Sequence, residues 1–256
     1  MVLLKRFQAY WPYWRRFGFR GRTIAQKLFP SDSPPVGTLG SVRLPWFYIP
    51  LIFRHGTVDA SVFCEIFVEC IYETKLPFSP KTIVDAGANV GFSALFFHKM
   101  YPTAEIVALE AEESNFALLK KNVLAYPKIR PLNAALWYKD GNVSLMNDQS
   151  THSTFRFHDG LSEKNIVPAL CPRSIMDEMN WSKIDLFKIN IEGGERDLFG
   201  HEPLDWIPKV NAFAMDLHDR FLPGCSEVVN NVLVPAGFDH RFLGEIHLFL
   251  RATYPK

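Results

Sequence analysis

Apolar and polar positions along residues 82–136 follow a rhythm that predicts strands and helices in turn. Short β-branched runs at 82–86 and 105–110 have an acidic residue at or next to their last position, Asp85 and Glu110, and 129–136 forms a third run. Apolar residues share one face of each intervening helical pattern: Phe92, Leu95 and Phe96 in the first, and Phe116, Leu119 and Val123 in the second. Strand, helix, strand, helix, strand at this spacing predicts parallel βαβ units.

The rhythm breaks after Leu136, and residues 137–172 have the pattern of a hairpin and loops. The later predicted elements are a short helix at 174–180, strands at 183–191 and 209–218, a helix at 226–234, and strands at 238–243 and 246–251. Only a tight turn at Gly244 separates the last two strands, so they must be antiparallel. The expected fold is therefore α/β, a Rossmann-like, mostly parallel seven-stranded sheet with a C-terminal antiparallel hairpin.

Composition narrows the class of protein. The 256 residues are 48% hydrophobic and 14% aromatic, which excludes a mainly disordered, collagenous or coiled-coil chain. The net charge of +1 gives no reason to expect a nucleic-acid partner. Four cysteines without metal or disulfide spacing, and no apolar run of about 20 residues, predict a cytoplasmic protein.

The N-terminus differs from the rest. Residues 1–30 hold seven Lys or Arg, eight aromatic residues and no Asp or Glu, and a proline- and glycine-rich linker follows at 30–40. We expect an N-terminal extension over 1–41 and one main domain over 42–256. Two roles for residues 1–30 stay open: aromatic residues that pack on the main domain as a lid, or weak contact with an anionic membrane surface. A nucleic-acid contact is the third and weakest alternative.

The strongest local signal is the loop after the first regular strand. Asp85, Gly87, Asn89 and Gly91 follow that strand and precede a helix, and Glu110 ends the next strand. Ligands of such sheets bind at the carboxyl ends of the strands. The spacing is not that of a dinucleotide-binding glycine loop. An acid at the loop suits a ligand with a positive charge, and Glu110 suits two ribose hydroxyls, so these five residues predict S-adenosylmethionine as cofactor.

At these residues the sequence resembles the FkbM-type methyltransferases, a class I, S-adenosylmethionine-dependent family. The segments that carry the resemblance are "RHGTVD" at 54–59, "VFCEIF" at 62–67, "IVDAGANVGFSALFF" at 83–97, "NAAL" at 133–136, "IDLFKINIEGGERDLF" at 184–199 and "MDLHDRFLPG" at 215–224. The resemblance implies a class I methyltransferase fold over about residues 42–251. Asn133 and Ala134, which end the third strand, are expected to border the adenine, and for Asn133 a structural role in a turn stays open as an alternative.

The residues that act in the reaction are expected where the fourth and fifth strands end. Lys188, Asn190 and Glu192 lie at the end of the fourth strand, and His218 ends the fifth. The family signature usually has an aspartate where this chain has Asn190. His218 is the first candidate for the base that removes a hydroxyl proton, and Glu192 is the second. For Glu195, a partner of the helix dipole and a site role stay open.

The resemblance implies methyl transfer to an acceptor oxygen, on a sugar, a glycan or another small metabolite. The alternative is a non-catalytic protein that binds the cofactor or a glycan, which Asn190 motivates. Glu192, Asp216 and Asp219 are the carboxylates that could hold a magnesium ion, but with Asn190 in place of an acid we expect no metal. The oligomeric state stays open.

Overall fold

The computed structural model describes residues 11–147, 155–158, 165–219 and 222–252. The chain divides into two compact units, residues 1–71 and 72–256, and each is described by itself.

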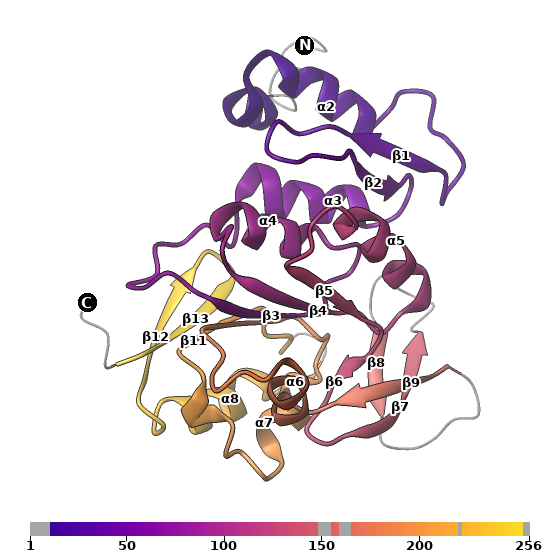
Figure 1. Cartoon of the computed structure of the whole chain (residues 1–256). Helices are drawn as coiled ribbons and strands as arrows, with labels where there is room; N and C mark the ends of the chain where they lie inside the picture. The colour runs from indigo at the N-terminus through magenta and orange to yellow at the C-terminus, as the bar shows by residue number, and fades with distance from the viewer. Residues whose placement is uncertain (1–10, 148–154, 159–164, 220–221, 253–256) are drawn as a thin grey trace. The chain divides into compact units, whose positions relative to one another are not determined.

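The first unit combines short helices with a two-stranded antiparallel sheet (Figure 1). Residues 11–17 are helical, and the further elements are a 3₁₀ turn Gly18–Arg20, α2 (Gly21–Leu28), β1 (Leu39–Val42), β2 (Leu51–Arg54), α3 (Asp59–Phe63) and a π-helical turn Cys64–Glu69. The expected boundary after residue 41 falls inside β1, which pairs with β2.

Residues of the N-terminal segment pack inside this unit. The Tyr13 hydroxyl lies 2.7 Å from Cys64 Sγ, and the Phe17 ring lies 6.5 Å from that of Phe63. One face of α2 is buried through Ile24 and Leu28. The compact unit therefore runs to Ile71, well beyond the expected extension.

The second unit contains the predicted sheet, and the fold class is confirmed. Seven strands lie in the order β12-β13-β11-β10-β3-β4-β5. Five of them are parallel, while β13 pairs antiparallel with β11 and with β12. The strands are β3 (Thr82–Ala86), β4 (Glu105–Leu109), β5 (Ile129–Leu132), β10 (Leu186–Ile189), β11 (Ala212–Met215), β12 (Phe238–Leu243) and β13 (Ile246–Arg251).

Helices cover both faces of this sheet (Figure 1), with α4 and α5 on one face and α6, α7 and α8 on the other. Their bounds are α4 (Phe92–Met100), α5 (Glu113–Val123), α6 (Pro172–Met179), α7 (Glu195–Gly200) and α8 (Cys225–Leu233), with a 3₁₀ turn at Ile207–Lys209. The predicted apolar face of the first helix is buried, since Phe92, Leu95 and Phe96 are at most 1% exposed. Phe187, Phe213 and Phe249 anchor the core on the opposite face.

One predicted strand is divided. Residues 129–136 form β5 and then, after a break, β6 (Ala135–Leu136), which belongs to a second sheet. That sheet has the order β6-β9-β7-β8, where the further strands are β7 (Gly141–Asn147), β8 (Phe155–His158) and β9 (Ile166–Leu170). The region expected to be hairpin and loops thus contains the antiparallel pair β7 and β8 together with β9. A small core of its own includes Ala135, Trp137 and Val143.

Within the described ranges, no helix combines the length and apolar character needed to cross a membrane.

Candidate active site

The loop after β3 is pressed against the chain that leaves β10. Gly87 has a φ of +73°, and a Cβ at this position would lie 1.9 Å from the backbone oxygen of Asn190. β3 and β10 are neighbours in the sheet, and the chain continues from β3 in the other direction to β4, so this is the switch point of the sheet. A glycine at this position therefore allows the close approach of the two loops.

Gly91 closes the same loop immediately before α4, with a φ of +92°. A Cβ there would lie 2.7 Å from Cδ1 of Leu119 in α5. The absence of a side chain at Gly91 thus allows α4 to begin close against α5.

Asp85 is fully buried at the end of β3, and its charge is compensated within the protein. Its Oδ1 lies 3.0 Å from Lys188 Nζ, and its Oδ2 accepts a hydrogen bond from the Ser93 hydroxyl at 2.6 Å. Lys188 also donates to the backbone oxygens of Ala86 and Gly87, at 3.1 and 2.8 Å. Both groups therefore stabilise the loop, although Asp85 Oδ1, which faces Lys188, has no hydrogen-bond partner among the described residues. The expectations that Asp85 meets a cationic ligand and that Lys188 takes part in the reaction stay predictions.

Glu110, after β4, connects the two loops that would face a nucleoside. Its Oε2 accepts from the Asn89 amide at 2.8 Å, and its Oε1 accepts from the Glu112 amide at 2.9 Å. Burial raises the pKa of Glu110, although these two N–H groups oppose the shift. A carboxylate offers about four acceptor positions. Glu110 therefore keeps acceptor capacity for ligand hydroxyls.

Asn89 provides a second acceptor beside Glu110. It adopts the left-handed backbone conformation, with a φ of 50°. Its Oδ1 is buried and has no hydrogen-bond partner among the residues that the structure describes. An orphaned buried oxygen of this kind suits a ligand with a hydroxyl or ammonium donor. Glu110 and Asn89 together fit the ribose and amine of S-adenosylmethionine better than the buried Asp85 does.

The end of β5 closes this side of the site. Asn133 Nδ2 donates to the backbone oxygens of Glu110 and Ala111, at 2.9 and 3.2 Å, and so fastens β5 to the chain after β4. Ala134 is 4% exposed and packs in the main core. The expectation that Ala134 borders an adenine is therefore replaced by a packing role, whereas Asn133 is half-buried at the edge of the site.

Acidic side chains surround the imidazole of His218, which is 1% exposed at the end of the fifth parallel strand, β11. Its Nδ1 lies 3.3 Å from Glu195 Oε1, while its Nε2 lies 3.5 Å from Glu192 Oε2 and 3.7 Å from Asp216 Oδ2. Burial lowers the pKa of His218, but the hydrogen bond with Glu195 and the charges of all three carboxylates raise it above its ordinary value. His218 was the first candidate for the base. A buried imidazole that favours its protonated form and faces carboxylates on both nitrogens is poorly suited to that role.

Glu195 is the residue that organises this cluster, and it is fully buried. Its Oε1 accepts from the Ile191 amide at 3.0 Å, and its Oε2 accepts from the Gly193 amide at 2.8 Å. The same carboxylate faces His218. Glu195 thus shapes the turn that carries Glu192 and fixes the imidazole behind it. In the sequence, Glu195 stands at the start of a helix. A favourable interaction with the helix dipole would by itself explain an acidic residue at that position.

The two carboxylates on the Nε2 side are the more accessible ones. The side chains of Glu192 and Asp216 are 25% and 35% exposed. Glu192 also has a φ of 56°, a conformation that costs a non-glycine residue energy and is concentrated at functional sites. The arrangement can therefore present a carboxylate to a substrate, with the buried imidazole of His218 behind it.

Asp219, a candidate metal ligand in the sequence, stabilises the start of α8. Its carboxylate accepts from the amides of Gly224 and Ser226 and from the Ser226 hydroxyl, so it caps the start of α8. In the part of the chain that the structure describes, no group of three or more His, Cys, Asp or Glu is arranged to hold a metal ion.

Comparison with known proteins identifies the family of the chain. The family model for the methyltransferase FkbM domain matches residues 85–252. Methyltransferase 1 of Beauveria bassiana (strain ARSEF 2860) is 24% identical over 159 residues, which cover 52% of this chain and 63% of that protein. Methyltransferase sdnD of Sordaria araneosa is 38% identical over 88 residues, which cover 33% of this chain and 34% of that protein. The chain thus spans less than two thirds of both curated relatives.

Among solved structures, the methyltransferase FkbM from Methylobacillus flagellatus KT is similar, with 13% identity and a TM-score of 0.41. The alignment covers 75% of this chain and 53% of that one. The family match over residues 85–252, and not the distant structural likeness, shows to which family the chain belongs.

Proposed function

This chain belongs to the FkbM methyltransferase family, and from that premise we propose that it transfers a methyl group from S-adenosylmethionine to a hydroxyl oxygen of a sugar, a glycan or another small metabolite. The observation that carries the proposal is the cluster of Glu192, His218 and Asp216 at the carboxyl edge of the sheet. Glu192 comes two residues after Asn190, whose backbone contacts the loop at Gly87.

S-adenosylmethionine, when bound, supplies an electrophilic methyl group on a sulfonium. Glu110 and Asn89 would hold its polar groups, since both offer acceptor oxygens next to the loop after β3. The ion pair between Asp85 and Lys188 stabilises the conformation of that loop. Most of the rate enhancement of an in-line transfer can come from positioning the two reactants.

The acceptor hydroxyl must lose a proton as its oxygen takes the methyl group. Glu192 is the residue to receive it, because its carboxylate is partly exposed and lies 3.5 Å from the His218 imidazole. His218 fixes the position of the Glu192 carboxylate, so it acts as a positioning residue. Asp216 occupies an equivalent place 3.7 Å from the same nitrogen and is the second choice. We place this reaction in the cytoplasm, on the strength of the cysteine pattern of the sequence.

A specific residue supports a second candidate, a protein that binds the cofactor without catalysing transfer. Asn190 carries an amide where the family signature usually carries a carboxylate, and its backbone oxygen lies against the loop at Gly87. If that charge is required for the reaction, the chain retains binding and has lost turnover.

The experiment that decides between them uses S-adenosylmethionine labelled in its methyl group with a panel of hydroxylated sugars, glycans and small metabolites. We expect the native chain to bind the cofactor in calorimetry and to transfer label to at least one acceptor. Transfer that appears only in Asn190→Asp would favour the non-catalytic protein. Binding of NAD with no binding of S-adenosylmethionine would exclude both.

A further inference from the structure

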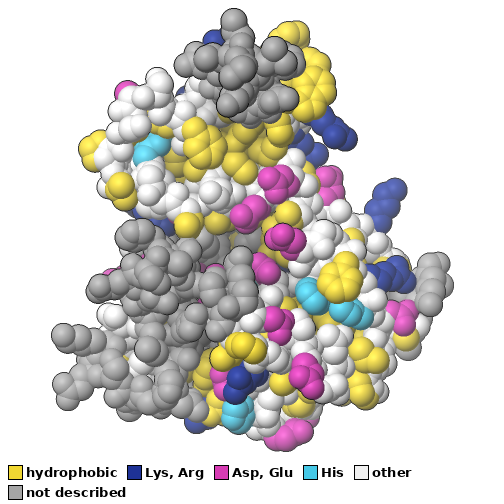
Figure 2. Space-filling view, turned by 180° about the vertical axis from the view of Figure 1, so that it is seen from behind, with side chains coloured by type: hydrophobic (Ala, Val, Ile, Leu, Met, Phe, Trp, Pro, Cys, Tyr) yellow, Lys and Arg dark blue, Asp and Glu magenta, His cyan; other side chains and the backbone are white. Residues whose placement is uncertain are grey.

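Exposed apolar side chains are concentrated in the first unit. Among the described residues, eight large exposed apolar side chains lie in residues 1–71 and four in residues 72–256, although the second unit is much longer. Those of the first unit are Trp11, Trp14, Phe19, Phe29, Val36, Leu39, Trp46 and Tyr48. Figure 2 shows such side chains, in yellow, gathered over this unit with dark blue Lys and Arg side chains at their edge. Patches of this kind usually mark an interaction site.

The same stretch of chain is strongly cationic. Residues 11–43 contain six Lys or Arg and a single acid, Asp32. Five of these cations are exposed: Arg15, Arg20, Arg22, Lys27 and Arg43. A partner that complements this surface must therefore combine negative charge with an apolar region.

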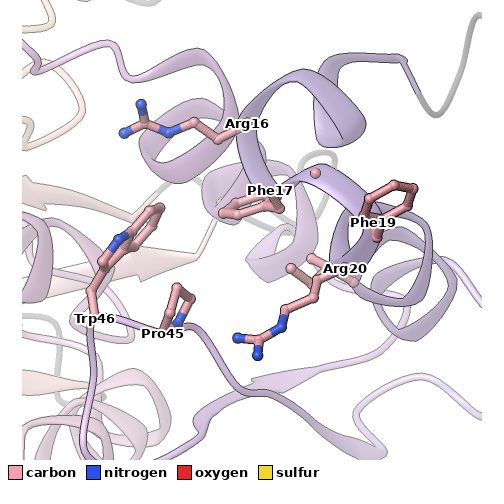
Figure 3. A pocket seen from close by; sticks show the side chains of 8 residues that line it. Arg16, Phe17, Phe19, Arg20, Pro45 and Trp46 are labelled. Atoms are coloured by element: carbon pink, nitrogen blue, oxygen red, sulfur yellow. The ribbon is translucent and has the colours of Figure 1, made fainter.

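A pocket of about 440 Å³ lies within this surface. Its lining consists of Arg16, Phe17, Gly18, Phe19, Arg20, Ile24, Pro45 and Trp46, without any carboxylate. Figure 3 shows the Phe17 ring between the guanidinium groups of Arg16 and Arg20, with Pro45 and Trp46 on the facing wall. Arg16 is held in place, because its Nε donates to the Phe67 backbone oxygen at 3.2 Å and its guanidinium lies 5.4 Å from the centre of the Trp46 ring.

We propose that this pocket takes the phosphate headgroup of an anionic phospholipid, and that the surrounding aromatic and cationic surface docks the first unit on an anionic bilayer. Arg20, which lines the pocket, supplies positive charge for the phosphate. The Phe19 ring, which is 96% exposed, reaches the boundary between headgroups and acyl chains. Tryptophan and tyrosine prefer this interfacial depth. Single-stranded nucleic acid would use the stacked Trp11 and Trp14 rings, but it offers no counterpart for the exposed aliphatic side chains Val36 and Leu39.

The test is co-sedimentation of the full chain with vesicles of phosphatidylcholine alone and of phosphatidylcholine with about one third phosphatidylserine. We expect binding to the anionic vesicles at low salt and a strong loss of binding at high salt, where charges are screened. Arg20→Gln should weaken partitioning about five-fold, the effect of one cation near such a surface. Phe19→Ser should weaken it without a change in thermal stability, since this ring is almost fully exposed.

Matched controls come from the second unit. Lys121→Gln removes an exposed cation, and Leu124→Ser removes a side chain that is 83% exposed. Both should leave partitioning at the native level. Equal partitioning of native chain, Arg20→Gln and Lys121→Gln would overturn the proposal, as would equal binding to the two kinds of vesicle. Binding to a single-stranded oligonucleotide without binding to vesicles would replace the bilayer by a nucleic acid.

Discussion

The backbone oxygen of Asn190 occupies the place that a side chain at position 87 would need, 1.9 Å from the Cβ that Gly87 lacks. This contact joins the two loops that carry the candidate cofactor residues and the candidate base. Because Gly87 also has a φ of +73°, both space and backbone conformation exclude other residues there.

We therefore expect Gly87→Ala to destabilise the fold by about 2–4 kcal/mol, the combined effect of backbone strain and a displaced loop. Urea denaturation gives the difference in unfolding free energy. Gly237→Ala is the matched control, since Gly237 has a φ of +86° with open space around its missing Cβ. It should lose only about 1–2 kcal/mol. Equal losses in the two variants would show that the Asn190 contact has no energetic weight.

The buried pair of Asp85 and Lys188 predicts strong coupling. Lys188→Met leaves the Asp85 carboxylate, 0% exposed, without its cation, and should cost about 3–5 kcal/mol in unfolding free energy. Asp85→Asn combined with Lys188→Met should recover a large part of that loss. A double-mutant cycle by denaturation measures the coupling, and additive losses would contradict a direct interaction between the two groups.

These two relationships show what the sequence could and could not predict. The hairpin at 238–251 and the ends of β3 and β4 follow from local patterns, so Asp85 and Glu110 could be placed at the carboxyl edge. The partner of the Asp85 loop, Lys188, lies about one hundred residues further along the chain, and no local pattern specifies that contact. The break between β5 and β6 is similarly hidden, because the whole run 129–136 reads as one strand.

His218 predicts a pH-dependent stability. Burial lowers its pKa, but Glu195, Glu192 and Asp216 raise it above the unfolded value of about 6.5. The native state thus holds the proton more tightly than the unfolded state. The resulting stability is fully present below about pH 6.5 and is lost as pH rises through the folded pKa. The stability difference between the native chain and His218→Asn, measured by urea denaturation, should therefore shrink as the pH rises above about 6.5.

His240 supplies a control of opposite sign. Burial lowers its pKa, so its neutral form is favoured in the folded chain, where it stacks on Phe249 at 4.3 Å. Its contribution is present above about pH 6.5 and is lost as pH falls. His240→Gln should thus show the reverse trend, and identical trends for the two variants would contradict the assigned surroundings of His218.

Glu110 predicts the affinity for the cofactor. Glu110→Gln should weaken S-adenosylmethionine binding by roughly 1–3 kcal/mol, because it removes a charged acceptor for ligand hydroxyls. Isothermal titration calorimetry measures this, with the exposed Glu113→Gln, in the first turn of α5, as the control that should bind like the native chain. If Glu110→Gln bound the cofactor with native affinity, the ribose would not be bound at the end of β4.

The most direct test of the central claim is transfer of labelled methyl from S-adenosylmethionine by Glu192→Gln, with each variant saturated with cofactor and with an acceptor that the native chain methylates. General base catalysis typically contributes a factor of about 10²–10⁴, so transfer should fall by at least about 100-fold while cofactor affinity stays near the native value. Glu227→Gln, an exposed acid in the first turn of α8, should transfer label at the native rate. Undiminished transfer by Glu192→Gln would contradict the role assigned to this carboxylate.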